Sequence, residues 1–212
     1  MHDTVIFDFD GTLADSERLM LEALNALAGE FGFAALTLQE IPQLRKLSAR
    51  ELVTKRLRIP AWKVWKLYRL EKRSKAEFAK RSAGLHVFPG MREVLLELRE
   101  SGWRIGIVSS AAAEVVERVV REESLPADFV YAGSSALWKA HAIRAALAKE
   151  GIYKEHVFYV GDELRDAEAC ARVGILMIAV GWGLNDADTL QRVGVEVATT
   201  PQELYSMIVA KE

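Results

Sequence analysis

Residues 5–13 read Val-Ile-Phe-Asp-Phe-Asp-Gly-Thr-Leu, and this stretch decides how the rest of the chain is interpreted. Its apolar start is typical of a buried parallel strand, because such a strand is covered on both faces. Side chains alternate along a strand, so Asp8 and Asp10 project to the same side, with Phe9 between them. Gly11 allows a tight turn and a close approach of the backbone to a ligand. Two carboxylates at the carboxyl end of a strand lie where open α/β sheets bind their ligands.

The composition of the whole chain limits the classes of protein to consider. With 212 residues, half of them hydrophobic, the chain is long enough for one large domain or for a core with an insertion. Its net charge of −2 argues against general affinity for nucleic acid. The single cysteine, Cys170, excludes an internal disulfide and a cysteine-based zinc site. We find no signal peptide and no apolar run of membrane-spanning length, so we expect a cytoplasmic protein without a membrane segment.

Residues 16 to about 82 contain helical patterns and no convincing strand. The pair Asp15-Ser16 is suited to cap a helix that continues to about Phe31, with leucines at helical spacing. Residues 48–51 form a candidate capping box. The segment is therefore predicted to be all-helical.

Residues 45–81 are strongly basic, because Lys and Arg there far outnumber Asp and Glu. Trp62, Trp65 and Tyr68 are interleaved with these charges at helical spacing. We interpret the stretch as a solvated helix whose aromatic stripe packs inward against a core. The alternative is a surface that binds an anionic substrate or a nucleic acid.

From residue 87 onward, predicted strands alternate with predicted helices. The strands are expected at 104–109, 129–132, 156–161 and 176–180, with a final edge strand at 193–198. The helices are expected at 91–101, 113–123, 139–150, 166–173 and 201–209. Such alternation indicates a parallel sheet with helices on both faces, to which the strand at Val5 also belongs.

Polar side chains follow four of these strands at the point where each strand ends. In chain order they are Asp8, Asp10, Gly11 and Thr12 after the first strand, Ser109 and Ser110 after the second, Lys139 in the helix after the third, and Asp162 and Asp166 after the fourth. Asp162 and Asp166 are four residues apart and share one face if a helix starts in the turn. Two carboxylates about 4 Å apart repel by about 4 kcal/mol at an effective dielectric of about 20. A converging set of four therefore requires a cation.

The oxygen-only donor set suits Mg²⁺, which keeps several waters and also binds substrate phosphate. One serine, one lysine and turn N–H groups beside the metal form an anion pocket. The chemistry expected there is phosphoryl transfer. One carboxylate is suited to act as a covalent nucleophile, and its neighbour to protonate the leaving oxygen and then activate water.

At this point the sequence resembles the haloacid dehalogenase superfamily, and within it the phosphoglycolate phosphatases and their relatives. Residues 8–16 are similar to the first motif of that family, and residues 107–110 to the second. Lys139 stands at the third motif, although Ala140 replaces the proline that often follows the lysine. Residues 161–166 are similar to the fourth motif, Gly-Asp-x-x-x-Asp.

The resemblance implies a Rossmann-like doubly wound α/β core formed by residues 1–15 and 87–212. Residues 16–86 would form an inserted all-α cap of the C1 type. The first strand would lie centrally, between the second and the fourth. Asp10 favours phosphoryl chemistry, because the dehalogenases proper lack an acid there.

The resemblance also implies a role for each motif residue. Asp8 would be the nucleophile, and Asp10 the general acid/base that also gives a backbone carbonyl to the metal. Mg²⁺ would be bound by Asp8, Asp10, Asp162 and Asp166. The phosphoryl oxygens would be bound by Gly11, Thr12, Ser109, Ser110 and Lys139.

The sequence thus predicts a Mg²⁺-dependent phosphatase that acts on a small phosphorylated metabolite through an aspartyl-phosphate. Two alternatives stay open: a phosphomutase of the β-phosphoglucomutase type, and a regulatory protein that binds a polyanion through its basic cap. The basic cap also suggests a substrate with additional negative charge, such as a phospho-carboxylate or a nucleotide. We expect neither a membrane nor nucleic acid as a partner, and a monomer and a homodimer are equally compatible with the sequence.

Overall fold

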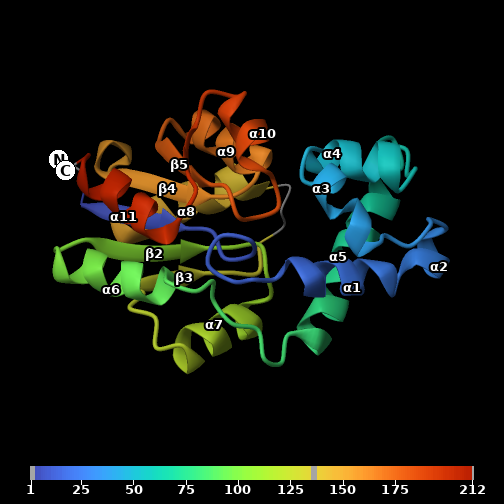
Figure 1. Cartoon of the computed structure of the whole chain (residues 1–212), viewed down its shortest axis with the longest axis horizontal. Helices are drawn as coiled ribbons and strands as arrows, with labels where there is room; N and C mark the ends of the chain where they lie inside the picture. Colours follow the sequence, from blue (N-terminus) through green and yellow to red (C-terminus); the bar gives the residue numbers. More distant parts are fainter. Residues whose placement is uncertain (1–2, 135–137, 212) are drawn as a thin grey trace.

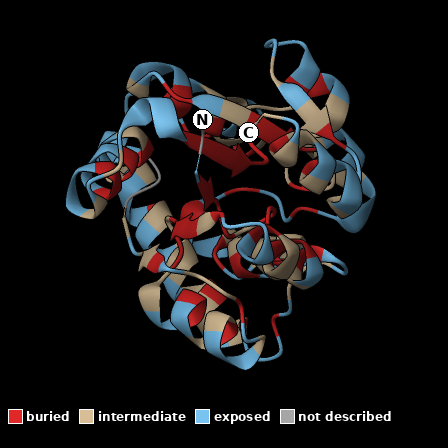
Figure 2. Cartoon of the chain, turned by 90° about the vertical axis from the view of Figure 1, so that its left-hand side faces the viewer, coloured by how far each residue is buried: buried red, intermediate tan, exposed pale blue. Residues whose placement is uncertain are grey.

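The computed structural model describes residues 3–134 and 138–211, and its centre is a six-stranded sheet. The strands lie in the order β3-β2-β1-β4-β5-β6, and every neighbouring pair is parallel. Their bounds are Thr4–Phe7 (β1), Arg104–Val108 (β2), Phe129–Tyr131 (β3), Val157–Gly161 (β4), Leu176–Val180 (β5) and Glu196–Ala198 (β6). The predicted α/β class and the central position of the first strand are confirmed. The central strands are buried on both faces, as Figure 2 shows in red.

Helices cover both faces of this sheet (Figure 1). They are α6 (Met91–Glu100), α7 (Ala113–Glu122), α8 (Lys139–Glu150), α9 (Leu164–Val173), α10 (Ala187–Gln191) and α11 (Pro201–Val209). One buried cluster joins α6, α7 and α11 to one face of the sheet, and a second joins α8 and α9 to the other. In the described part of the chain, no helix is sufficiently long and apolar to span a bilayer.

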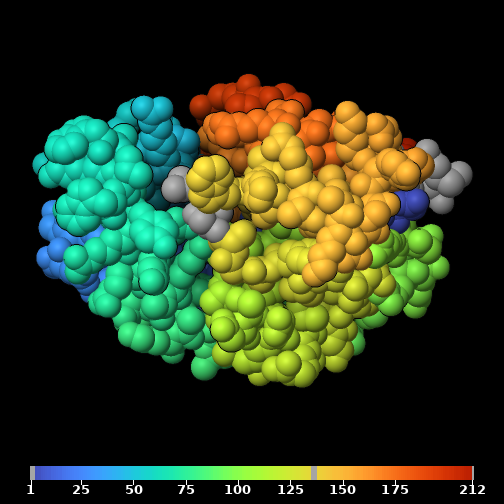
Figure 3. All heavy atoms as spheres, turned by 180° about the vertical axis from the view of Figure 1, so that it is seen from behind, coloured from blue at the N-terminus to red at the C-terminus, as the bar shows by residue number. Residues whose placement is uncertain are grey.

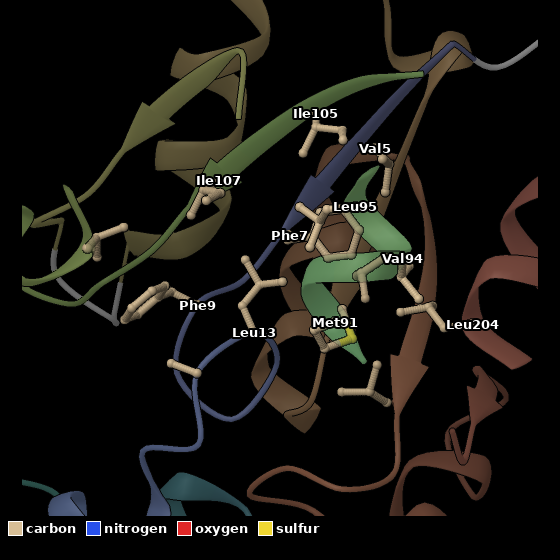
Figure 4. Close-up of a cluster of buried hydrophobic side chains, with 14 of the residues drawn as sticks. Val5, Phe7, Phe9, Leu13, Met91, Val94, Leu95, Ile105, Ile107 and Leu204 are labelled. Atoms are coloured by element: carbon tan, nitrogen blue, oxygen red, sulfur yellow. The ribbon is translucent and has the colours of Figure 1, made fainter. Parts of the chain in front are cut away.

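The side chains of β1 explain how one strand serves both layers. Val5 and Phe7 belong to the cluster with α6, whereas Ile6 belongs to the cluster with α8. Figure 4 shows Val5 and Phe7 packed beside Leu95 of α6. Burying each such side chain contributes about 1.5–3 kcal/mol. The position of β1, and with it the position of the residues that follow it, is therefore strongly determined by packing.

The segment between β1 and α6 is helical and lies beside the sheet-containing part (Figure 1). Its α-helices are α1 (Glu17–Asn25), α2 (Ala28–Phe31), α3 (Ile41–Leu44), α4 (Ala49–Glu51) and α5 (Val64–Arg81). The segment has a hydrophobic cluster of its own, which includes Leu27, Phe31, Leu57 and Leu70. The predicted helix to Phe31 is interrupted between α1 and α2, and Ser16 makes no side-chain cap. The capping box of Ser48 and Glu51 is present.

The aromatic stripe contradicts the interpretation made from the sequence. Trp62, Trp65 and Tyr68 are 76%, 66% and 57% exposed, so they do not pack inward. The buried face of α5 is formed by Leu70 and Phe78 instead. Trp62 precedes the first residue of α5, so the stripe is only partly helical. The periodicity correctly predicted a helix, but the wrong face of that helix was expected to pack inward.

Candidate active site

Asp8 lies directly after β1 and extends the pairing of that strand by one residue. Its backbone N–H donates to the carbonyl of Val160 in β4 over 2.8 Å. Its side-chain Oδ1 accepts a hydrogen bond from the N–H of Phe9 over 2.8 Å. The Asp8 side chain is buried and is held at the carboxyl end of the central strand.

The turn after Asp8 brings the chain against Asp162 at the end of β4. Gly11 has a φ of 76°, and a Cβ at this position would lie 2.2 Å from Oδ2 of Asp162. Only glycine therefore fits. The Thr12 hydroxyl donates to Oδ1 of Asp162 over 2.7 Å, and the N–H of Leu184 donates to Oδ2 over 2.7 Å. The Thr12 side chain thus positions Asp162.

Asp166 lies in the first turn of α9, close to Asp162. Its Oδ2 accepts hydrogen bonds from the backbone N–H groups of Asp162 and Glu163, over 3.2 and 3.1 Å. Carboxylates are favourable in the first turn because the helix N-terminus carries a partial positive charge. The spacing of four residues therefore brings both acids together, as the sequence indicated.

Lys139 connects the two sides of the site. The side chain is 6% exposed, and its ammonium forms ion pairs with Asp8 and with Oδ1 of Asp166, the latter at 2.6 Å. The position of Lys139 as the first residue of α8 is also as predicted. The third motif, which had the weakest sequence signal, therefore reaches the same carboxylates as the first and the fourth.

The remaining predicted residues differ in whether their polar side-chain atoms are hydrogen-bonded within the protein or line a cavity. Ser109 is buried, and its Oγ accepts from the N–H of Ala111 over 3.0 Å. Ser110 and Asp10 line a cavity of about 290 Å³ between the sheet-containing part and the helical segment. Oδ1 of Asp10 is buried and has no hydrogen-bond partner in the described residues. That atom is available to a group that enters the cavity.

Burial makes the charged forms of these acids unfavourable. It raises the pKa of Asp8, although the nearby Lys139 ammonium opposes the change. Burial, reinforced by Glu163, raises the pKa of Asp162 well above its ordinary value. Burial and the charge of Asp8 raise the pKa of Asp10 to about 7. The site thus holds more negative charge than Lys139 neutralises.

A divalent cation fits this arrangement. Asp8, Asp162 and Asp166 each offer a buried carboxylate oxygen, and the three atoms lie within 4.8 Å of one another. All the donors are oxygens, which Mg²⁺ prefers. The added positive charge would favour the ionised forms of Asp8 and Asp162, which burial makes unfavourable.

Two features of the site were not assigned a role from the sequence. Glu163 forms an ion pair with Arg165, and both side chains line the cavity. Asn185, 4% exposed, accepts from the N–H of Leu164 over 2.9 Å and donates to the carbonyl of Arg45 over 2.8 Å. A single asparagine after a strand carries no recognisable signal, because its partner lies 140 residues away.

Comparison with known proteins agrees with this geometry. The chain is 36% identical to a phosphoglycolate phosphatase of Synechococcus elongatus, over 88% of this chain and 87% of that protein. It is 30% identical to the tyrosine-protein kinase PtkA of Mycobacterium tuberculosis, over 92% of this chain and 67% of that one. A predicted phosphatase of Clostridium acetobutylicum shares the fold, with a TM-score of 0.82, 18% identity and 99% of both chains covered. The pattern of the haloacid dehalogenase-like hydrolases matches residues 5–180, so the chain belongs to that family.

Proposed function

We propose that the protein is a Mg²⁺-dependent phosphatase that hydrolyses a small-molecule phosphate monoester through an aspartyl-phosphate on Asp8. The observation that carries the proposal is the contact set of Asp8. This buried carboxylate lies at the end of the central strand, forms an ion pair with Lys139, and has Asp162 and Asp166 beside it. The similarity to phosphoglycolate phosphatases supports the same reaction class.

Asp8, Asp162 and Asp166 would hold the magnesium ion, together with the backbone carbonyl of Asp10 that the family resemblance implies. The bound ion would supply positive charge that offsets the charge of the phosphoryl oxygens. Thr12 and the N–H of Leu184 would keep Asp162 oriented, because both hydrogen-bond to its carboxylate.

The proposed reaction has two steps. In the first, an Asp8 oxygen attacks phosphorus, the bond from phosphorus to the ester oxygen breaks, and the Asp10 carboxyl gives its proton to the leaving alkoxide. In the second, the Asp10 carboxylate removes a proton from a water that attacks the aspartyl-phosphate, which releases phosphate and restores Asp8. A pKa of about 7 suits Asp10 to both transfers, because an acid/base group works best near the operating pH.

Lys139 and the strand-end residues would bind the phosphoryl oxygens. The Lys139 ammonium already forms an ion pair with Asp8, so it is positioned to bind a phosphoryl group that is transferred to that residue. Ser109, Ser110 and the backbone of Gly11 and Thr12 complete the predicted set. Of these, Ser110 lines the cavity directly.

We further propose that residues 16–86 form a cap, and that residues 1–15 and 87–212 form the core. The separate hydrophobic cluster of the helical segment supports this division. The cavity lies between the two parts, so closure of the cap would exclude water while the aspartyl-phosphate forms. The cap would also contact the alcohol part of the substrate.

The test is phosphate release from a panel of phosphate esters, with Mg²⁺ and with a chelator. Wild type is compared with Asp8→Asn and with Asp3→Asn, whose exposed side chain lies at the opposite end of the same strand. We expect Mg²⁺-dependent release by wild type and Asp3→Asn, and none by Asp8→Asn. Isomerisation of a hexose 1-phosphate in place of release would indicate the phosphomutase alternative.

A further inference from the structure

The cavity beside Asp10 offers information about the alcohol part of the substrate. Its volume of about 290 Å³ lies near the lower limit of small-molecule sites, which is about 300 Å³. The lining combines Asp10 and Ser110 with side chains from α1, α3 and α5. A phosphate ester whose phosphoryl group reaches Asp8 would therefore place its alcohol part against the helical segment. Figure 3 shows the outer surface of that segment, in blue to teal, beside the sheet-containing part.

The cations that line the cavity are already neutralised. Arg45 pairs with Glu17 at 2.7 Å, and Lys75 pairs with Glu71 at 3.0 Å. Arg165 pairs with Glu163. The three carboxylates of these pairs line the cavity as well. A carboxylate or second phosphate on the substrate would have to displace one of them.

The rest of the lining is mainly apolar. It includes Met20, Leu21, Leu24, Leu36, Leu44 and Phe78. Burying a charged group among such side chains is unfavourable unless a partner of opposite charge is present. An apolar group gains from the same surroundings, because its surface is removed from water. The lining thus favours an uncharged alcohol over glycolate.

We propose that the leaving alcohol is uncharged and largely apolar, so that the substrate is an alkyl, aryl or alicyclic phosphate monoester. The inference rests on the proposed phosphatase function and specifies its substrate class. It replaces the expectation of a doubly anionic substrate that the basic stretch 45–81 suggested. The two basic residues of that stretch that line the cavity, Arg45 and Lys75, are both paired.

The first test compares esters of increasing chain length on the wild-type protein. The series is methyl, butyl and hexyl phosphate, with the ω-carboxyalkyl phosphate of matched length and 2-phosphoglycolate as charged counterparts. We expect kcat/KM to rise about twofold to fourfold per methylene, as burial of each methylene predicts. Each carboxylated ester should fall about tenfold below its uncharged match, because its carboxylate loses hydration without gaining a free cation.

Two variants test the cavity itself. Leu44→Trp fills part of it and should lower the ratio of kcat/KM for hexyl over methyl phosphate about tenfold, comparable to the loss of two methylene contacts. Leu38→Trp is the matched control, since Leu38 is exposed on the same segment and does not line the cavity. Glu17→Gln releases Arg45 from its partner and should raise the ratio of carboxylated over alkyl ester at least about tenfold, the lower end of the range for a hydrogen bond to a charged group.

The outcomes separate this inference from the function on which it rests. A flat chain-length series, or a preference for 2-phosphoglycolate, overturns the inference even when hydrolysis depends on Mg²⁺ and Asp8. An unchanged ratio in Glu17→Gln overturns the charge argument, and the wild-type series decides the apolar argument if Leu44→Trp does not fold. If no ester is hydrolysed, the proposed function and the inference both fail.

Discussion

Lys139 forms an ion pair with Asp8, although the two residues are 131 positions apart in the sequence. The same ammonium lies 2.6 Å from Oδ1 of Asp166. One buried cation thus stands between two buried carboxylates that would otherwise repel each other. Folding brings this charge to the site, so the stability of the core and the proposed binding of a phosphoryl group depend on the same side chain.

Replacing Lys139 by methionine tests that dependence. Removing one partner of a buried ion pair leaves uncompensated charge, so Lys139→Met should lower the free energy of unfolding by about 3–5 kcal/mol. Urea denaturation measures the change. Lys149→Met is the control on the same helix, because Lys149 is exposed and its ammonium lies over the ring of Tyr131. Its expected loss is at most about 1 kcal/mol, and equal losses in both variants would contradict the assignment.

The raised pKa of Asp10 predicts a pH dependence that varies with the leaving group. Asp10 is protonated below a pH of about 7 and loses its proton above it. In the proposed mechanism, hydrolysis of an alkyl phosphate needs that proton, so kcat/KM should fall as the pH rises through about 7. Hydrolysis of p-nitrophenyl phosphate, whose leaving group needs no proton, should be less sensitive. Identical pH profiles for both esters would exclude Asp10 as the general acid.

Replacing Asp10 by asparagine should therefore have unequal effects on the two esters. Loss of an acid/base group costs about 10²–10⁴-fold in rate, and this loss should appear with the alkyl ester. With p-nitrophenyl phosphate, the loss of rate in the first step should be smaller. Rapid-mixing measurement of nitrophenol release reports the rate of that step. Asp188→Asn, an exposed substitution in α10, is the control. If Asp10→Asn hydrolyses both esters at the wild-type rate, Asp10 is not the general acid/base.

Magnesium should stabilise the protein, and the effect should grow with pH. Burial raises the pKa of Asp162 above its value in the unfolded chain, so the folded state binds more protons between those two values. Stability without metal is therefore highest at low pH and is lost as the pH rises through this interval. Mg²⁺ at about 100 times its Kd adds about 2.7 kcal/mol. Thermal unfolding with Mg²⁺ and with chelator measures the difference, and Asp162→Asn should remove it.

The sequence indicated the site because each of its main residues follows a strand. Asp8 and Asp162 end neighbouring strands, so their convergence follows from the sheet order alone. The approach of Lys139 to Asp8 also depends on the length of the loop before α8, and no local sequence pattern specifies that length. The exposed position of Trp65 was missed because periodicity gives the spacing of a helix face but not its orientation toward a core.

The link between core and helical segment could not be read from the sequence, because it depends on how two separately packed parts meet. Asn185 follows β5, and its amide donates to the carbonyls of Arg45 and Leu47 over 2.8 and 3.0 Å. Its Oδ1 accepts from the N–H of Leu164 in α9 over 2.9 Å. One side chain thus connects the helix that carries Asp166 to the helical segment.

Substituting Asn185 by aspartate should loosen this link. The carboxylate still accepts from Leu164, but it no longer donates to the two carbonyls, and an unsatisfied buried polar group costs about 1–3 kcal/mol. We expect faster amide hydrogen exchange near residues 45–47 and a higher KM, with α8 unaffected. Asn25→Asp is the matched control, since Asn25 makes the same kind of bonds to Leu36 within the helical segment. It should accelerate exchange around Leu36 and leave exchange near residue 164 unchanged. Equal effects of the two variants near residue 164 would show that Asn185 stabilises the fold generally and does not couple the two parts.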